Sequence, residues 1–394
     1  MSSPRLIVIG AGPAGLAAAL GGVRRGLEVT VLERDEVGAS LRRWGPTRFF
    51  SPLSMNLPPG AAKILADRLP GGDALLTGPE FAETVLAPLA SSEALRGRVL
   101  PRHRVVAVGR AGLTRLDFAG HPIRAERPFR LLVETPEGER TFEAEAVIDA
   151  SGTYGHPTAA GLGGIPAAGE RALAAERIIR DLGALHARRS ALARRRVLLI
   201  GHGHSAANAV AELADLADQA AGTQVVWATR SLNLRPCTEI ANDPLPERQK
   251  VVARANQLAL RPPGWLTMER KASVEAFNLE SEDRVRARLS GGREVSVDQI
   301  VALTGYRPDL SFLSELAIAL DPATEGPARL ARALTHVTDC LSVPSVRPED
   351  LSSGEPGFYF AGAKSYGRSR TFLLQTGYHQ LETILDLIAS GVFL

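Results

Sequence analysis

The sequence predicts an α/β fold in which one nucleotide-binding domain is inserted into another, accompanied by an antiparallel β meander. Three observations lead to this prediction. Residues 6–33 and 196–230 each read as an apolar strand, a glycine-rich turn, a helix and a second strand. Short alternating strands occupy residues 99–148, between these two βαβ units. The chain ends in an apolar strand and an amphipathic helix, which are expected to complete the first domain after the inserted one.

The composition is that of an ordinary globular protein. The 394 residues are 45% apolar and 23% charged, which suits two or three domains, or one large domain with an insertion. The net charge of +3 is not concentrated in any segment, so we expect no nucleic-acid partner.

The apolar residues 6–20 carry glycines at the spacing of a phosphate turn, which argues against an export signal. No run is long enough to span a bilayer, so the expected location is cytoplasmic, without a membrane partner.

The chain has two cysteines, Cys237 and Cys340, and they lie far apart in the sequence. No CxxC motif occurs, which suits a reducing compartment. Dithiol–disulfide chemistry usually needs a nucleophilic thiol paired with a resolving thiol. The cysteine pattern therefore argues against that chemistry.

The first glycine-rich turn, residues 10–15 with the sequence GAGPAG, matches the dinucleotide fingerprint GxGxxG between a strand and a helix. Gly10 permits the tight turn, Gly12 lets the backbone approach a pyrophosphate, and Gly15 lets the helix pack on the strand. Pro13 suits the first helical turn, because its missing N–H would have no partner there. The free N–H groups at the helix start can bind phosphate. The alternative is a glycine-rich turn that binds nothing.

The second turn differs from the first at the residue that meets the ribose. Glu33 ends the first unit, where a carboxylate accepts hydrogen bonds from ribose hydroxyls. Residues 201–206 read GHGHSA, with Ala206 as the accepted variant of the third glycine. The strand that follows ends in residues 229–231, TRS, without an acid, and Arg230 could pair with a 2′-phosphate. The second site is therefore expected to prefer NADPH; the alternative is that Arg230 is a surface charge.

We expect no metal site. His202 and His204 both lie in the second turn, and no cysteine or acidic cluster stands beside them.

The predicted domains are residues 1–190 and 298–394 for the first nucleotide and 191–297 for the second. Further elements are expected as helices at 61–69, 79–89 and 377–388, strands at 105–108, 129–133, 141–144, 285–289, 299–303 and 357–362, a turn at 136–138 and a long ordered loop at 47–59.

Together these residues resemble the two-dinucleotide-binding flavoproteins, and especially the flavin-containing (class B) monooxygenases, over most of the chain. Besides the fingerprints, the resemblance rests on residues 147–154, VIDASGTY, and 301–308, VALTGYRP. In such proteins these hinge-like segments lie where the chain passes between the FAD and NADPH domains. Residues 55–58, MNLP, resemble the family's TN-x-P stretch, whose Asn lies near the flavin and the nicotinamide. Residues 359–363, YFAGA, resemble the segment that passes the FAD ribityl chain.

The sequence also departs from the family. The usual Asp after Gly362 is absent, and Asp149-Ala150-Ser151-Gly152 differs from a plain ATG. Where an FxGxxxH segment should precede the second fingerprint, the chain has GLGGIP at 161–166 and a later His186.

The resemblance implies two Rossmann-like dinucleotide-binding domains, with the NADPH domain inserted into the FAD domain. It gives Asn56 a catalytic role; the alternative is that Asn56 caps the helix after Pro59. The helix near Gln375 would point its N-terminus at the isoalloxazine. The predicted cofactor-binding residues are Gly10, Gly12, Pro13, Ala14, Gly15, Glu33, Arg34, Trp44, Gly201, Gly203, His204, Ser205, Ala206, Arg230, Gly305, Gly362, Gln375 and Thr376.

The implied reaction is hydride transfer from NADPH to FAD, followed by reaction with O₂ to a C4a-peroxyflavin that oxygenates a small molecule at N, S or a carbonyl. Trp44, Arg48, Phe49, Phe50 and Met55 could line the pocket, although core packing explains each equally well. An alternative is a reductase that passes electrons to a quinone, ferredoxin or other acceptor. A third is a non-catalytic flavin-binding module or assembly factor. The substrate and the oligomeric state, with a homodimer as one option, stay open.

Overall fold

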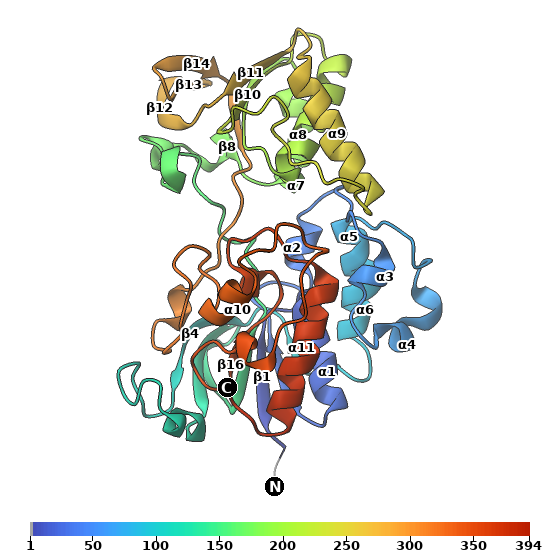
Figure 1. Cartoon of the computed structure of the whole chain (residues 1–394), viewed down its shortest axis with the longest axis vertical. Coiled ribbons are helices and arrows are strands. Elements are labelled where there is room, and N and C mark those ends of the chain that lie inside the picture. The colour runs from blue at the N-terminus through green and yellow to red at the C-terminus, as the bar shows by residue number, and fades with distance from the viewer. Residues whose placement is uncertain (1–2) are drawn as a thin grey trace. The chain divides into compact units, whose positions relative to one another are not determined.

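The structure is a computed structural model that describes residues 3–394 (Figure 1). It contains two compact units, and the chain passes between them four times. Unit 1 holds the described residues up to Arg42, together with 52–156 and 306–394; unit 2 holds 43–51 and 157–305. The predicted domain limits at 190/191 and 297/298 both fall inside unit 2. None of the described helices is both long and apolar enough to cross a membrane.

Unit 1 is built on a parallel sheet of five strands in the order β16-β7-β1-β2-β3. The strands are β1 (Arg5–Ile9), β2 (Glu28–Leu32), β3 (Val99–Leu100), β7 (Ala146–Asp149) and β16 (Phe358–Phe360). The helices α1 (Pro13–Arg24) and α11 (Leu374–Ala389) lie side by side against it (Figure 1). The first βαβ unit therefore folds as predicted.

An antiparallel meander follows in the same unit, as predicted. Its strands are β4 (Arg104–Arg110), β5 (Phe129–Thr135) and β6 (Gly138–Ala144). Thr135 pairs with Gly138, so a two-residue loop joins the last two strands. Alternate side chains of β5 are buried in one cluster with residues of the parallel sheet, which makes the meander one wall of the core.

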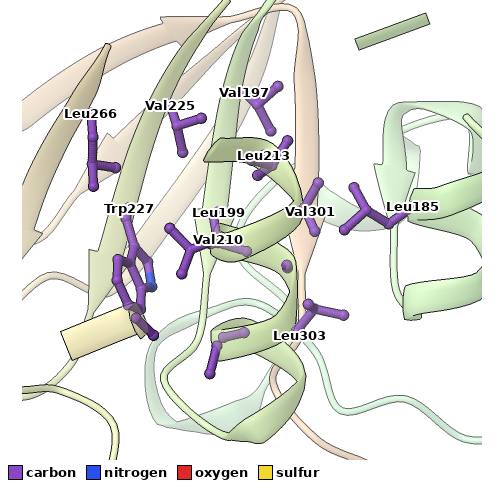
Figure 2. Packing of buried hydrophobic residues seen from close by; sticks show 14 of the residues in the cluster. Leu185, Val197, Leu199, Val210, Leu213, Val225, Trp227, Leu266, Val301 and Leu303 are labelled. Carbon is purple, nitrogen blue, oxygen red and sulfur yellow. The ribbon is translucent and has the colours of Figure 1, made fainter. Parts of the chain in front are cut away.

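Unit 2 has the parallel order β11-β10-β9-β15-β8. The strands are β8 (Ile178–Ile179), β9 (Arg196–Ile200), β10 (Gln224–Thr229), β11 (Leu266–Arg270) and β15 (Gln299–Ala302). The helices α8 (His204–Gln219) and α9 (Pro246–Leu260) cover one face, where apolar side chains of β9, β10 and α8 interdigitate (Figure 2). A second meander, β12 (Val274–Ser281), β13 (Arg284–Leu289) and β14 (Arg293–Val297), shares the cluster on the other face.

The two units repeat one plan. In each, the first strand of the βαβ unit is central, its second strand and a third strand lie on one side, and the strand after the meander lies on the other. The sequence predicted only the βαβ part of this repeat. The second meander was not recognised beyond β13, because charged residues occupy many of the outward positions in β12 and β14.

The helices predicted at 61–69 and 79–89 are present but divided. The first is α4 (Ala61–Leu65) followed by η1 (Ala66–Arg68); the second is α5 (Gly78–Phe81), a π turn η2 (Ala82–Leu86) and α6 (Ala87–Ala90). Pro88 explains the widened turn, because its ring would clash with the carbonyl of Thr84 in a regular helix. The loop expected at 47–59 contains a short helix, α3 (Leu53–Asn56).

The remaining short elements are α2 (Ala39–Arg42), η3 (Pro122–Glu126), η4 (Leu162–Gly164), η5 (Glu170–Ala172), η6 (Ala175–Arg177), α7 (Leu182–Ala187), η7 (Arg189–Leu192), η8 (Ser311–Leu313), α10 (Ala328–Ala333), η9 (Pro348–Leu351) and η10 (Gly362–Tyr366).

A fully buried charge cluster connects the meander of unit 1 to its C-terminal part. Glu355 accepts from Arg110 at 2.8 Å and from Arg124 at 2.9 Å, and all three side chains are inaccessible to solvent. The backbone N–H of Ala317 donates to the same carboxylate at 2.8 Å. Burial alone would raise the pKa of Glu355, but the hydrogen bonds from both arginines outweigh it and hold that pKa below its usual value.

We predict that Glu355→Gln lowers the free energy of unfolding by about 3–5 kcal/mol, because two buried arginines lose their counter-charge. The matched control is Glu134→Gln, whose exposed pair with Arg104 should contribute at most about 1 kcal/mol. Urea unfolding at neutral pH measures both.

The same cluster predicts acid sensitivity. Since the pKa of Glu355 is lower in the folded state, its contribution is complete above the unfolded-state pKa of about 4.3 and is lost as pH falls through the folded-state pKa. Glu355→Gln should flatten this part of the stability–pH curve. Equal effects of the two substitutions, or an unchanged curve, would contradict the account.

Candidate functional site

The first phosphate turn needs two of its glycines for its own geometry. Gly10 has a φ of +100°, and a Cβ there would lie 2.8 Å from the carbonyl oxygen of Ala150. A Cβ on Gly15 would lie 1.8 Å from the carbonyl oxygen of Gly10. Gly12 differs, because its φ is −82° and a Cβ would meet nothing within 4 Å. The space beside Gly12 is thus open for a ligand, as an approaching pyrophosphate requires.

The start of α1 is suited to binding an anion. Gly12 is its N-cap residue, Pro13 occupies the first turn, and no side chain in the described part of the chain caps the helix. The N–H groups of the first turn, including those of Ala14 and Gly15, therefore stay available to phosphate oxygens.

Glu33 is held against this turn. Its two carboxylate oxygens accept the N–H groups of Ala11 at 2.7 Å and of Asp35 at 2.8 Å. Burial raises the pKa of Glu33 despite these hydrogen bonds. Each oxygen keeps acceptor capacity for a ribose hydroxyl. Arg34 is exposed next to it and, with Arg102 and other residues, lines an open hollow of about 350 Å³.

The second turn has nearly the same backbone. Gly201 has a φ of +126°, and a Cβ there would lie 2.3 Å from the carbonyl oxygen of Leu303. Gly203 caps α8 with φ −83° and ψ −176°, against −82° and −172° for Gly12. The buried Trp227, labelled in Figure 2, donates its ring N–H to the carbonyl of Gly201 at 2.7 Å. This bond ties the turn to the core of unit 2.

The first turn of α8 contains the other predicted residues of this site. His204 is exposed and lies with its ring edge-on to Phe50, at 5.5 Å between centroids. Ser205 is half-buried, and Ala206 is buried with its Cβ 3.7 Å from the Cβ position built on Gly201. The alanine thus fits where the first unit requires a glycine.

The strand registers show which residues correspond. Gly10 N–H donates to the carbonyl of Leu32, and Gly201 N–H donates to that of Ala228. Thr229 therefore stands where unit 1 has Glu33, and the exposed Arg230 corresponds to Arg34. The second site consequently has a buried threonine in place of the acid that is predicted to bind a ribose.

Lys271 is a second cation at this edge that the sequence reasoning missed. It is exposed, and its backbone N–H donates to the carbonyl of Ser231, next to Arg230, at 3.2 Å. It follows β11, which was not recognised as a strand, so no sequence signal placed it here.

Asn56 is buried and ends α3. Its carbonyl accepts the hydroxyl of Tyr378, on α11, at 2.7 Å. The first turn of α11 holds Gln375, which is exposed, and the half-buried Thr376, both just before Tyr378 in the sequence. The alternative role as a helix cap is wrong, because the N-cap of α4 is Gly60 and no hydrogen bond from a described side chain caps that helix.

Three other predicted residues are placed as follows. Gly362, with φ +68°, packs its Cα against Ala14 of α1, since a Cβ would lie 2.8 Å from the alanine Cβ. Gly305 is the last residue of unit 2 and accepts the N–H of Thr158 at 2.8 Å. Trp44 belongs to the segment 43–51 of unit 2, whereas Asn56 belongs to unit 1, so unit 1 does not bring them together.

The cysteines do not form a reactive pair within either unit. Cys237 is the only cysteine of unit 2; it is buried, and burial raises its pKa to about 12. Such a thiol stays protonated and is a poor nucleophile. Cys340 belongs to unit 1. Among the described residues, no three His, Cys, Asp or Glu side chains gather as a metal site.

Comparisons with known proteins agree with this architecture. A family model described as pyridine nucleotide-disulphide oxidoreductase matches residues 4–326. A search of curated protein sequences finds no match.

Similar solved structures show the same fold. The bacillithiol disulfide reductase of Bacillus cereus is 19% identical with a TM-score of 0.70, over 98% of this chain and 99% of the other. A Kutzneria ornithine N-hydroxylase is 18% identical with a TM-score of 0.65, over 98% and 99%. A mutant flavin monooxygenase from Stenotrophomonas maltophilia is 22% identical with a TM-score of 0.65, over 99% of both chains.

The glycine geometry predicts two different outcomes of substitution. Gly12→Val should leave the fold intact, because the side chain meets no protein atom, but should remove most of the bound FAD by occupying the path of the pyrophosphate. Gly15→Val is the contrast: it should destabilise the protein itself, because its Cβ overlaps the carbonyl of Gly10. Flavin absorbance per protein and the melting temperature measure the two effects. Full FAD occupancy in Gly12→Val would show that the pyrophosphate does not pass there.

Proposed function

Because the chain belongs to the pyridine nucleotide-disulphide oxidoreductase family, we propose that it is an FAD- and NADPH-dependent oxidoreductase that works without cysteine chemistry and acts as a monooxygenase. One observation carries the proposal: two phosphate turns of nearly equal backbone differ at the ribose position, where unit 1 has Glu33 and unit 2 has Thr229 followed by Arg230. A carboxylate suits the unsubstituted ribose of FAD, whereas an arginine suits a 2′-phosphate.

The residues of each unit fit their cofactor. In unit 1 the N–H groups of α1 would bind the FAD pyrophosphate, and Glu33 would bind the adenosine ribose. In unit 2 the start of α8 would bind the NADPH pyrophosphate, and Arg230 with Lys271 would hold the 2′-phosphate. The bound cofactors supply hydride and electron transfer, so the protein needs no nucleophile of its own.

Two features favour oxygenation. Asn56 is buried, and its main-chain carbonyl accepts the hydroxyl of Tyr378 on α11, so the backbone that carries its amide side chain is fixed beside that helix. The helix α11, whose first turn contains Gln375, would direct its N-terminal dipole toward a negatively charged, reduced flavin. We propose a small-molecule substrate that is oxygenated at N, S or a carbonyl carbon, with O₂ as co-substrate.

A second candidate is an NADPH-dependent reductase that passes electrons to a quinone, ferredoxin or another acceptor. The specific observation in its favour is the segment 161–166, GLGGIP, which lacks the Phe and His of the monooxygenase motif. Both candidates share the reductive half of the reaction and differ only in the electron acceptor.

Turnover with amines, sulfides and ketones decides between the two. NADPH oxidation, O₂ uptake, oxygenated product and H₂O₂ are measured together. A monooxygenase gives product in proportion to NADPH consumed with one of these substrates. Rapid NADPH oxidation with a quinone or ferredoxin, and no oxygenated product with any substrate, would contradict oxygenation.

Asn56→Asp adds a prediction to this assay. The variant should still bind FAD and NADPH but should lose product formation, with the electrons appearing as H₂O₂. Loss of one preorganised donor commonly costs on the order of 2.7–4 kcal/mol in the affected step. A variant that melts at a lower temperature but stays fully coupled would make Asn56 a structural residue.

The coenzyme preference is predicted to depend on Arg230. Arg230→Ala should weaken NADPH by about ten- to a hundredfold and leave NADH nearly unchanged, because only NADPH carries the 2′-phosphate. The control is Arg254→Ala, which removes an exposed arginine of α9 that pairs with Asp215. KM values for both coenzymes are the measurement. Equal losses for NADPH and NADH would show that Arg230 does not contact the 2′-phosphate.

A further inference from the structure

A buried ion pair lies at the carboxyl edge of the sheet in unit 1. Asp149, the last residue of β7, and Lys364, in η10, both have side chains with no solvent exposure. The Nζ of Lys364 lies 2.6 Å from Oδ2 of Asp149, and the ring of Phe312 lies 4.5 Å from the same nitrogen. Burying two charges is costly and does not by itself stabilise a fold. We therefore expect this ion pair to serve a purpose other than the stability of the fold.

Ser151 joins this pair to the surface. Lys364 Nζ donates to Ser151 Oγ at 2.9 Å, and Ser151 Oγ donates to Oδ1 of Asp149 at 2.6 Å. The backbone N–H of Ser151 also donates to that oxygen, at 3.1 Å. Unlike its two partners, Ser151 is exposed. The exposed hydroxyl is thus fixed by two buried, opposite charges.

Two segments that carry the hydrogen-bonded group Asp149, Ser151 and Lys364 pack closely against the first phosphate turn and the start of α1. A Cβ on Gly10 would lie 2.9 Å from the Cα of Ser151. A Cβ on Gly362, two residues before Lys364, would lie 2.8 Å from the Cβ of Ala14 in α1. The exposed end of the network therefore lies directly beside the turn that would hold a pyrophosphate.

The strand order indicates which part of the dinucleotide would meet Ser151. Along the sheet edge, Glu33 follows β2, the phosphate turn follows β1, and Ser151 follows β7, in the order β2-β1-β7. With the adenosine ribose at Glu33 and the pyrophosphate at the turn, the other half of the cofactor extends past the end of β7. In FAD that half begins with the ribityl chain.

The hydrogen bonds also define what Ser151 can recognise. A hydroxyl has one proton and two acceptor lone pairs. The proton of Ser151 goes to Asp149 and one lone pair goes to Lys364, so only an acceptor position remains. An acceptor suits a ribityl hydroxyl, which donates, and does not suit a phosphate oxygen.

We infer that Ser151 binds a ribityl hydroxyl of FAD and that Lys364 and Asp149 are positioning residues that hold it as an acceptor. The inference rests on the proposed FAD site and goes further, because it separates FAD from nucleotides that share only its ADP part. It follows that Ser151 and its partners contribute to FAD binding but not to ADP binding.

The test compares FAD with ADP as ligands of the full-length apoprotein. Ser151→Ala should weaken FAD by about three- to tenfold, the value of one hydrogen bond, and leave ADP affinity unchanged. Flavin fluorescence gives the FAD affinity, and competition gives the ADP affinity. Gly12→Val, by contrast, should weaken both ligands.

Ser311→Ala is the matched control, because it removes the same local bond without the lysine. Ser311 Oγ donates to Oδ1 of Asp309 at 2.6 Å and its N–H donates to the same atom at 3.0 Å, but Lys364 donates to Ser151 and not to Ser311. This variant should bind both ligands like the original protein. A loss of FAD equal to that in Ser151→Ala would overturn the inference.

A second variant tests the ion pair. Lys364→Met alone would leave Asp149 buried without its counter-charge, so it is combined with Asp149→Asn, which removes both charges together. The double variant should lose FAD affinity as Ser151→Ala does and keep ADP affinity.

The outcomes separate the two proposals. If the original protein binds no FAD, the proposed function fails. If it binds FAD, and Ser151→Ala binds FAD as tightly or loses FAD and ADP equally, only the role of Ser151 fails.

Discussion

The close approach of two backbones at a glycine governs the βαβ turn of both units. Gly10 and Gly201 have positive φ values. A Cβ on either would lie within 3 Å of the carbonyl oxygen of the residue that directly follows the neighbouring strand, which is Ala150 after β7 or Leu303 after β15. The strand can therefore turn sharply and present the start of the next helix at the sheet edge. In each unit, the helix N–H groups, the residue at the predicted ribose position and the segment after the neighbouring strand (β7 or β15) therefore follow adjacent strands at the same edge of the sheet.

The repeated plan makes the differences between the units informative. Both have a central strand, a phosphate turn, a helix and a meander in the same order, so corresponding positions can be compared directly. Glu33 is replaced by Thr229, and an exposed Arg230 follows. At the end of β7, unit 1 also has the buried Asp149 that pairs with Lys364. Under the proposed function, these differences at equivalent places would select two different nucleotides on the same backbone.

Much of this could be predicted from the sequence because its signals are local. The fingerprint glycines, Pro13 and Glu33 all lie within one βαβ unit, and the structure places them as that motif requires. The features that were missed depend on contacts between distant residues. Lys364 and Ser151 are 213 residues apart, and Glu355 meets Arg110 across 245 residues. No periodicity or spacing in the sequence reports such pairs.

The loop before Asn56 shows the same limit. Trp44 and Asn56 are close in sequence, yet the segment 43–51 packs with unit 2 and Asn56 belongs to unit 1, so their place in one pocket stays a prediction. A Cβ on Gly183 of α7 would lie 1.6 Å from the carbonyl oxygen of Arg43, so this packing depends on a glycine far along the chain. Local aromatic content could not reveal it.

The central claim is that electrons pass from NADPH to FAD without a thiol. Anaerobic mixing of stoichiometric NADPH with the Cys237→Ser, Cys340→Ser protein tests it most directly. We predict that the flavin absorbance bleaches as fast and as fully as in the original protein. A folded variant that holds FAD but stays oxidised, while the original protein bleaches, would contradict the claim.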